Sequence, residues 1–245
     1  MRLPEALGAD DGQCVAVVGA GGKKTTLYRL ASSLDRAVLT ATVRIPIFDD
    51  QVARVVTTDD PVSVLEHVDR ETWPLGVVSD PERDDRYPGY DPATVDAMAA
   101  AHDGAVLVKA DGARTRLLKA PDEREPQLPA AADTVLPIAS ARVVGNPLTE
   151  VWVHRPERVA SLTDLALGDR VTAEAVSRVL SSTRGGLKDV PPEATVIAVV
   201  NMIDDDDLFA VGERIAAETL ARTDRIDRVV LTHLLDPDPV VEQFA

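Results

Sequence analysis

Seven short apolar runs, separated by helical or loop segments, constrain the fold of this chain more than any other feature. They are continuous rather than alternating, which is typical of strands covered on both faces in a parallel sheet. The runs are residues 14–18, 37–42, 75–78, 105–108, 134–138, 195–200 and 228–231. They predict an α/β fold with a mainly parallel, doubly wound sheet and helices on both faces. We expect a single domain over residues 1–245, with loop-rich insertions near 80–91 and 120–130.

Helix signals lie between the apolar runs. Capping residues and a first-turn proline mark where several helices begin. The helices are expected over residues 93–101, 173–180 and 208–221, opened by Asp91 with Pro92, by Thr172 and by Asp207. In such a fold, ligands bind at the carboxyl ends of the strands.

A glycine-rich loop follows the first apolar run and leads into another helical pattern. Its residues are Gly19, Ala20, Gly21, Gly22, Lys23, Lys24, Thr25 and Thr26. Glycines allow several backbone N–H groups to converge on one point, and a helix N-terminus adds partial positive charge. The loop therefore predicts a fold of the phosphate-loop NTPase type that binds a nucleoside triphosphate, either ATP or GTP. It is shorter than the common G-x-x-x-x-G-K-[ST] loop, so an ordinary strand-to-helix turn and a dinucleotide fingerprint remain alternatives.

The polar residues of the loop have expected roles in catalysis and metal binding. Lys24 lies next to Thr25 and is assigned to the β- and γ-phosphates, with Lys23 as the second candidate. Asp111 closely follows the apolar run 105–108, where a carboxylate can hold Mg²⁺ opposite the hydroxyl of Thr25. The alternative for Asp111 is a common Asp-Gly turn.

A further motif follows the run 195–200. Asn201 and Asp204 resemble the Asn-Lys-x-Asp element with which GTP-binding proteins read guanine, with Met202 in place of the lysine. The alternative is that Asp204 begins a helix cap and a solvated charge run. The choice between GTP and ATP therefore stays open.

Cationic residues after Asp111 indicate a second, anionic substrate. We expect Arg114, Lys119 and Glu125 to line its side of the site, although surface ion pairing is the alternative. His154 and Arg155 either enter a helix or form part of a lid. The segment 185–188 either closes over a ligand or connects two elements.

The charge balance excludes some function classes. The chain has 26 Lys and Arg against 41 Asp and Glu, a net charge of −15, which argues against general nucleic-acid binding. Abundant aspartate with five lysines is a haloarchaeal-like composition, typical of a salt-saturated cytoplasm. The sequence contains no run of 18 apolar residues, the length that a membrane-spanning helix needs. The N-terminus has no apolar signal core, so we expect a cytoplasmic protein. Its single cysteine, Cys14, excludes an internal disulfide.

Several segments together resemble one protein family. In order they are VVGAGGKKTTLYRLA, VKADGARTRLLKAPDEREPQLP, VHRPE, GGLKDVP and VVNMIDD. The match to which they belong covers most of the chain from residue 15 to about residue 205. They are similar to the YqeC-type proteins, described as accessory proteins for selenium-dependent molybdenum hydroxylases and as selenium cofactor biosynthesis proteins. The resemblance implies a cytoplasmic phosphate-loop protein that acts in maturation of a molybdenum enzyme, with the hydroxylase or a cofactor intermediate as partner. Family members usually have Glu where this chain has Lys109, and often a single lysine before the threonines.

The leading hypothesis is a Mg²⁺-dependent nucleotide-binding protein, an NTPase, that acts in selenium cofactor biosynthesis. The first alternative is a nucleotide-dependent transferase or ligase that modifies a small anionic cofactor precursor. The second is a non-catalytic nucleotide-binding scaffold, which Lys109 favours. The sequence leaves the oligomeric state open.

Overall fold

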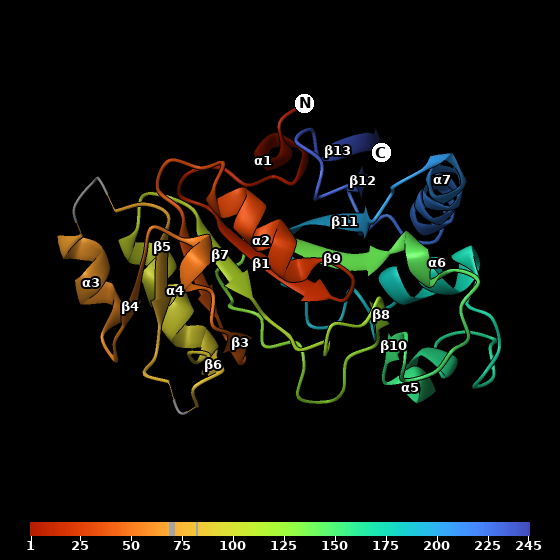
Figure 1. Ribbon diagram of the computed structural model, residues 1–245, viewed down its shortest axis with the longest axis horizontal. Coiled ribbons are helices and arrows are strands. Elements are labelled where there is room, and N and C mark those ends of the chain that lie inside the picture. The colour runs from red at the N-terminus through yellow and green to blue at the C-terminus, as the bar shows by residue number, and fades with distance from the viewer. Residues whose placement is uncertain (69–71, 82) are drawn as a thin grey trace.

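A mainly parallel sheet runs along the molecule in the computed structural model, which describes residues 1–68, 72–81 and 83–245 (Figure 1). Within these ranges, nine strands form it in the order β13-β12-β11-β9-β1-β7-β2-β5-β4, and only the β12–β13 pair is antiparallel. The strands are β1 Cys14–Gly19, β2 Val38–Ala41, β4 Arg54–Thr57, β5 Leu75–Val78, β7 Val106–Lys109, β9 Thr134–Ser140, β11 Thr195–Asn201, β12 Arg228–Thr232 and β13 Val240–Phe244. All seven apolar runs form strands of this sheet, which confirms the predicted α/β class.

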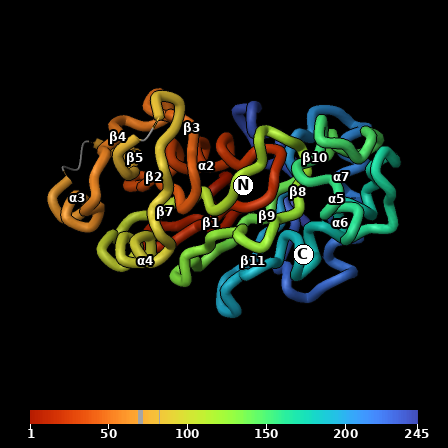
Figure 2. The backbone as a smooth tube through the Cα atoms, turned by 90° about the horizontal axis from the view of Figure 1, so that it is seen from below, coloured from red at the N-terminus to blue at the C-terminus, as the bar shows by residue number. Residues whose placement is uncertain are grey.

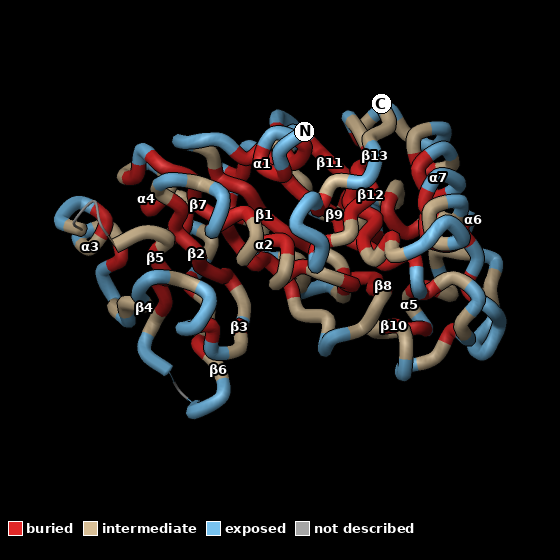
Figure 3. Tube along the Cα trace, turned by 45° about the horizontal axis from the view of Figure 1, so that its top comes forward, coloured by how far each residue is buried: buried red, intermediate tan, exposed pale blue. Residues whose placement is uncertain are grey.

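Helices cover both faces of the sheet. Successive residues of a strand point to opposite faces, so one strand packs against helices on both sides. Val15 and Val17 of β1 pack in one cluster with Leu27 of α2, whereas Ala16 packs on the other face in a cluster with Met98 of α4. Figure 3 shows that the strands of the sheet are mostly buried, whereas the outer helices α3, α6 and α7 carry exposed residues. The helices are α1 Leu3–Ala6, α2 Lys23–Ala31, α3 Pro61–His67, α4 Pro92–Ala101, α5 Pro156–Ala160, α6 Ala173–Leu180 and α7 Asp206–Leu220.

Two short strand pairs flank the main sheet. β3 (Ile45–Pro46) pairs antiparallel with β6 (Arg86–Tyr87), and β8 (Leu118–Lys119) pairs in parallel with β10 (Val153–His154). Figure 2 shows β3 on one side of β1 and α2, and β8 with β10 on the other. Each pair contributes side chains to the cleft described below.

The helix starts agree with the sequence signals except in one case. Thr172 caps α6 by accepting a hydrogen bond from the backbone N–H of Ala175 at 3.1 Å. The prediction that Asp207 opens the last long helix is wrong, because Asp205 is the cap and accepts from the N–H of Leu208 at 2.8 Å. Several consecutive aspartates compete for this position, and the one that ends in extended backbone becomes the cap.

Two segments left open by the sequence are connecting elements in the structure. Arg155 is the N-cap residue of α5, so the segment around His154 enters a helix. The turn at Gly185 is packed against the end of α6, since a Cβ on this glycine would lie 2.1 Å from the carbonyl oxygen of Val179. None of the helices formed by the described residues combines the length and apolar character needed to cross a membrane.

Candidate functional site

The glycine loop, residues 19–22, links β1 to α2 at the centre of the sheet (Figure 1). Gly21 and Gly22 have φ angles of 90° and 148°, which residues with a side chain rarely adopt. A Cβ on Gly21 would lie 2.7 Å from the backbone nitrogen of Ser140, and one on Gly22 would lie 2.3 Å from Nδ2 of Asn201. Both the backbone conformation and the close neighbours therefore require glycine at these positions.

Backbone N–H groups at the start of α2 are free to bind a ligand. Within the described part of the chain, the N–H groups from Gly21 to Thr25 have no hydrogen-bond acceptor, and the first helical bond joins the N–H of Thr26 to the oxygen of Gly22 at 2.9 Å. These residues line a cleft of about 900 Å³. Free N–H groups at the positive end of a helix dipole favour an anion.

The lining of this cleft is strongly basic although the chain as a whole is acidic. Among the described residues that line it, eight are Lys or Arg and one, Glu125, is a carboxylate. The basic residues are Lys23, Lys24, Arg44, Arg86, Lys109, Arg114, Arg116 and Arg155. Such a concentration of positive charge raises the local concentration of anions. Together with the free N–H groups, it makes the cleft a site for an extended, negatively charged ligand.

The two lysines that follow the loop, at the start of α2, are placed differently. Lys23 is 5% exposed, forms an ion pair with Asp111 and donates a hydrogen bond to the carbonyl oxygen of Gly19. Burial lowers the pKa of Lys23, and the Asp111 carboxylate acts in the opposite direction. Lys24 is half-buried on the cleft wall and has no hydrogen bond or ion pair with any described residue. Lys24 is therefore free to contact a ligand, as its predicted role requires.

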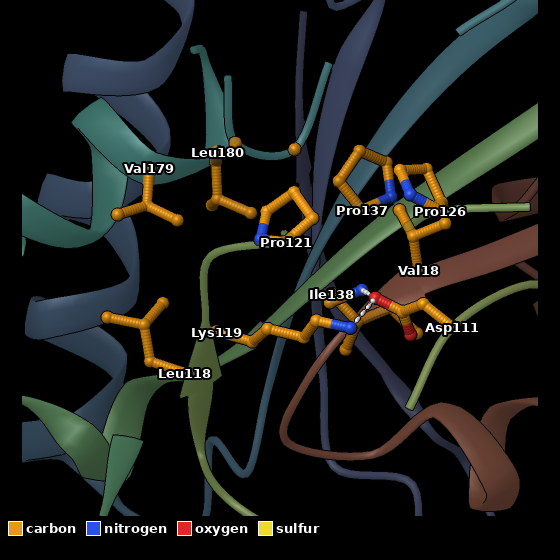
Figure 4. Close-up of a pocket in the computed structure, with 13 residues that line it drawn as sticks. Val18, Asp111, Leu118, Lys119, Pro121, Pro126, Pro137, Ile138, Val179 and Leu180 are labelled. Carbon is orange, nitrogen blue, oxygen red and sulfur yellow. Dashed lines mark hydrogen bonds and ion pairs between the residues drawn. The ribbon is translucent and has the colours of Figure 1, made fainter. Parts of the chain in front are cut away.

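Asp111 connects Lys23 to a series of side chains of alternating charge that leads away from the loop. Its Oδ2 atom accepts from Lys119 at 2.8 Å and from the N–H of Gly19 at 2.9 Å. Lys119 also pairs with Glu125 at 2.7 Å, and Glu125 pairs with Arg155 at 2.7 Å. In Figure 4 the Lys119 ammonium reaches Asp111 beside a small cavity of about 20 Å³. We call this chain, from Lys23 through Asp111, Lys119 and Glu125 to Arg155, the ion-pair chain.

The ion-pair chain changes the roles available to two predicted substrate residues. The side chain of Lys119 is fully buried, so in this structure it does not face a second substrate. Burial acts to raise the pKa of Glu125, but the Lys119 ammonium and hydrogen bonds from Gly112 and Arg155 outweigh it and hold the pKa at about 2. Glu125 is thus an ionised partner of two cations, and of the three predicted residues Arg114 alone lines the cleft with an unpaired charge.

The donors around Asp111 do not fit a directly ligated Mg²⁺. Both of its carboxylate oxygens are taken, one by Lys23 and the other by Lys119 and Gly19. Across residues 1–68, 72–81 and 83–245, no group of three or more His, Cys, Asp or Glu is placed to hold a metal ion. The pairing of Thr25 with Asp111 as metal ligands therefore stays a prediction.

Asn201 has a role that the sequence did not indicate. Its side chain is buried, donates to the carbonyl oxygen of Gly21 at 2.9 Å and accepts from the Thr232 hydroxyl at 3.1 Å. It therefore ties the glycine loop to β12. Asp204 pairs with Arg142 and lies 3.2 Å from a ring nitrogen of His233. Met202, which lies between Asn201 and Asp204 in the sequence, lines the cleft. Reading of a base by Asn201 and Asp204 stays a prediction.

Comparison with known proteins identifies the family. A family model described as "YqeC protein" matches residues 15–157, more than half of the chain. The chain belongs to the YqeC family. The uncharacterized protein YqeC of Escherichia coli strain K12 is 29% identical over 193 residues, which cover 76% of this chain and 75% of that protein. The resemblance inferred from the motifs is confirmed.

The region matched by the YqeC model includes most of the cleft, where Lys109 and His154 also have shifted pKa values. Lys109 is 6% exposed and donates to the carbonyl oxygen of Arg44 at 2.7 Å. Burial, followed by the nearby Lys23 ammonium, lowers the pKa of Lys109 to about 7. Burial also lowers the pKa of His154 to about 4, and the Arg155 charge adds to the shift. This YqeC-family chain thus has a neutral imidazole among the cations of its cleft at neutral pH.

Proposed function

We propose that this YqeC-family protein binds a nucleoside triphosphate, ATP or GTP, in the cleft and hydrolyses it. One observation carries the proposal: free N–H groups from Gly21 to Thr25 and the unpaired Lys24 face a cleft lined by eight basic residues and one carboxylate. A triphosphate chain is the ligand class that combines several closely spaced negative charges with the acceptor oxygens that such N–H groups need. The cleft volume, about 900 Å³, lies within the range of ligand pockets and leaves room for a nucleoside.

The residues of the site divide the work of binding. The loop N–H groups and Lys24 contact the β- and γ-phosphates. Lys23 acts indirectly, because its bonds to Asp111 and Gly19 hold the loop in its curled form. Mg²⁺ arrives with the nucleotide, since this ion is usually bound through phosphate oxygens and water with few protein ligands.

The biological setting that we propose is maturation of a selenium-dependent molybdenum hydroxylase. Family membership supports this part of the proposal. The hydroxylase or an intermediate of its cofactor is then the partner that nucleotide binding serves.

A second candidate function is a nucleotide-dependent transferase or ligase that modifies a small anionic precursor. It is favoured by the cations of the cleft beyond the glycine loop, among them Arg114 and Arg155, beside the neutral ring of His154. Product analysis separates the two functions, because an NTPase yields only the nucleoside diphosphate and phosphate. A scaffold that binds nucleotide without turning it over would yield neither product.

Direct binding of ATP and GTP to the purified protein tests the proposal, with and without Mg²⁺, in molar KCl to suit the acidic surface. Lys24→Ala is expected to lower the affinity at least about tenfold, as for loss of one charged phosphate contact. Lys188→Ala is the matched control, because Lys188 pairs with the neighbouring Asp189 outside the cleft. Absence of binding by the wild-type protein, or equal affinity in Lys24→Ala, would overturn the proposal. A preference for GTP that disappears in Asp204→Ala would identify the base reader.

A further inference from the structure

The segment Gly112–Leu117, which we call the arch, spans the glycine loop. At one foot, Asp111 accepts from the N–H of Gly19, the first residue of the loop. At the other foot, the carbonyl oxygen of Leu117 would lie 2.8 Å from a Cβ on Gly21 and accepts from the N–H of Ser140 at 3.0 Å. The two feet thus lie next to the loop at Gly19 and at Gly21. The residues between them line the same cleft as the loop does.

The tip of the arch has a strained backbone. Arg114 and Thr115 follow one another with φ angles of 46° and 58°, in the left-handed region that disfavours side chains. The strain is greatest for Thr115, because its Cβ is branched. Such residues cost roughly 1–3 kcal/mol each and cluster at functional sites, where the surrounding structure enforces them.

Neighbouring contacts enforce this conformation. The Arg116 guanidinium donates to the carbonyl oxygen of Glu150, and the N–H of Arg116 donates to Ala113 at 2.9 Å. The N–H of Leu117 donates to the oxygen of Trp152 at 2.9 Å. Arg116 therefore helps to hold the arch through its side chain and its backbone.

The side chain of Arg114 is free. It is exposed to the cleft and has no hydrogen bond or ion pair with any described residue. Arg155, another cation of the cleft, is paired with Asp122 and Glu125. In a chain with 41 acidic residues, an arginine without an acidic partner at the tip of a strained arch is placed for a ligand.

We propose that the arch holds Arg114 over the terminal phosphate of a triphosphate bound at the glycine loop, and that Arg114 distinguishes triphosphates from diphosphates. This inference rests on the proposed function. A guanidinium can donate two parallel hydrogen bonds to phosphate oxygens. A diphosphate ends at the loop, so it lacks the group that Arg114 contacts. Arg114 is thereby assigned to the nucleotide and not to a second substrate.

Arg114 also stabilises the hydrolysis step. Water attacks the γ-phosphorus, the bond from that phosphorus to the β–γ bridging oxygen breaks, and its electron pair stays on the diphosphate. The products are the nucleoside diphosphate, inorganic phosphate and a proton. Arg114 forms no covalent bond, and its charge offsets the negative charge that spreads over the transferring group.

The test compares affinities for a non-hydrolysable triphosphate analogue and for the diphosphate of the same nucleoside. Arg114→Gln is expected to lower the triphosphate affinity about tenfold, to leave the diphosphate affinity within about twofold, and to slow hydrolysis about 100-fold or more. Arg124→Gln is the matched control, because it removes the same charge from an exposed position on the same connection, outside the cleft. It should change neither affinity.

The arms of this test separate the inference from the proposed function. Equal losses of triphosphate and diphosphate affinity in Arg114→Gln, or no loss at all, would overturn the role of Arg114 while the Lys24→Ala result upholds the nucleotide site. Failure of the wild-type protein to bind either nucleotide would overturn both. Arg114→Gly removes the side chain and suits the left-handed backbone, so it should fold and lose triphosphate preference to the same extent. Arg114→Lys keeps the charge and should recover part of that preference.

Discussion

The charge state of Lys109 is sensitive to its surroundings in the cleft. Its ammonium is buried, donates to one carbonyl oxygen and has no carboxylate within ion-pair distance among the described residues. Burial lowers its pKa from 10.5 in water to about 7. The folded protein therefore holds this proton less tightly than the unfolded chain does, which makes stability depend on pH.

The Lys109→Met variant tests this dependence. Between about pH 7 and pH 10 the unfolded chain binds more protons at this position than the folded protein does, so this lysine makes stability rise with pH. The gain in unfolding free energy that comes from this lysine at high pH is lost as pH falls towards 7. We expect the stability advantage of Lys109→Met over the wild-type protein to be largest at pH 7 and smallest near pH 10. Urea unfolding of both proteins across this range measures it, and a constant difference would contradict the lowered pKa.

At the scale of elements, Asn201 joins the glycine loop to β12. Asn201→Ala leaves the carbonyl oxygen of Gly21 and the hydroxyl of Thr232 without their partner in a buried site. We expect a loss of about 2–3 kcal/mol of unfolding free energy, as for buried polar groups left unsatisfied, and weaker nucleotide binding as the loop loosens. Denaturant unfolding and nucleotide titration check both effects. Asp204→Asn is the control, and an equal loss of stability there would contradict the assigned role of Asn201.

The ion-pair chain joins β7, β8 and the start of α5. Lys119→Met removes a fully buried cation and leaves Asp111 and Glu125 with one fewer partner each. We expect a loss of about 3–5 kcal/mol, typical when one member of a buried charge pair is removed. Arg158→Met is the matched control, because Arg158 pairs with an exposed Glu123 and its loss should leave stability unchanged within error. Similar unfolding midpoints for both variants would show that the ion-pair chain contributes little to the unfolding free energy.

The sequence predicted those elements that are determined by their own residues. Long apolar runs such as the one in β11 form strands because both faces are buried, and Thr172 caps α6 through a local hydrogen bond. The two-residue strands β8 and β10 were not predicted, because they exist only through pairing between segments far apart in the chain. The same reason hides how two of the predicted site residues are held in place. Arg114 takes its left-handed conformation because segments beyond residue 138 anchor the arch, and Asn201 is read as a loop anchor only once β12 is placed.

For the whole molecule, the net charge of −15 predicts a dependence of stability on salt. Self-repulsion of surface carboxylates is screened within about 3 Å at 1 M salt and about 10 Å at 0.1 M. We therefore expect the melting temperature to rise by several degrees or more between 0.1 and 2 M KCl. Thermal unfolding followed by circular dichroism measures it. An equal or lower melting temperature in 2 M KCl would show that surface repulsion is not an important term.

The central position of β1 affects how the protein is made on the ribosome. β1 leaves the ribosome first among the strands, yet Gly19 bonds a residue 92 positions later and Cys14 bonds one 119 positions later. Such distant contacts form slowly, because a long stretch of chain must be ordered before they are made. Until β7 and β9 have been translated, both edges of β1 are bare and open to pairing with other nascent chains. The glycine loop is therefore synthesised well before the strands that complete its shape.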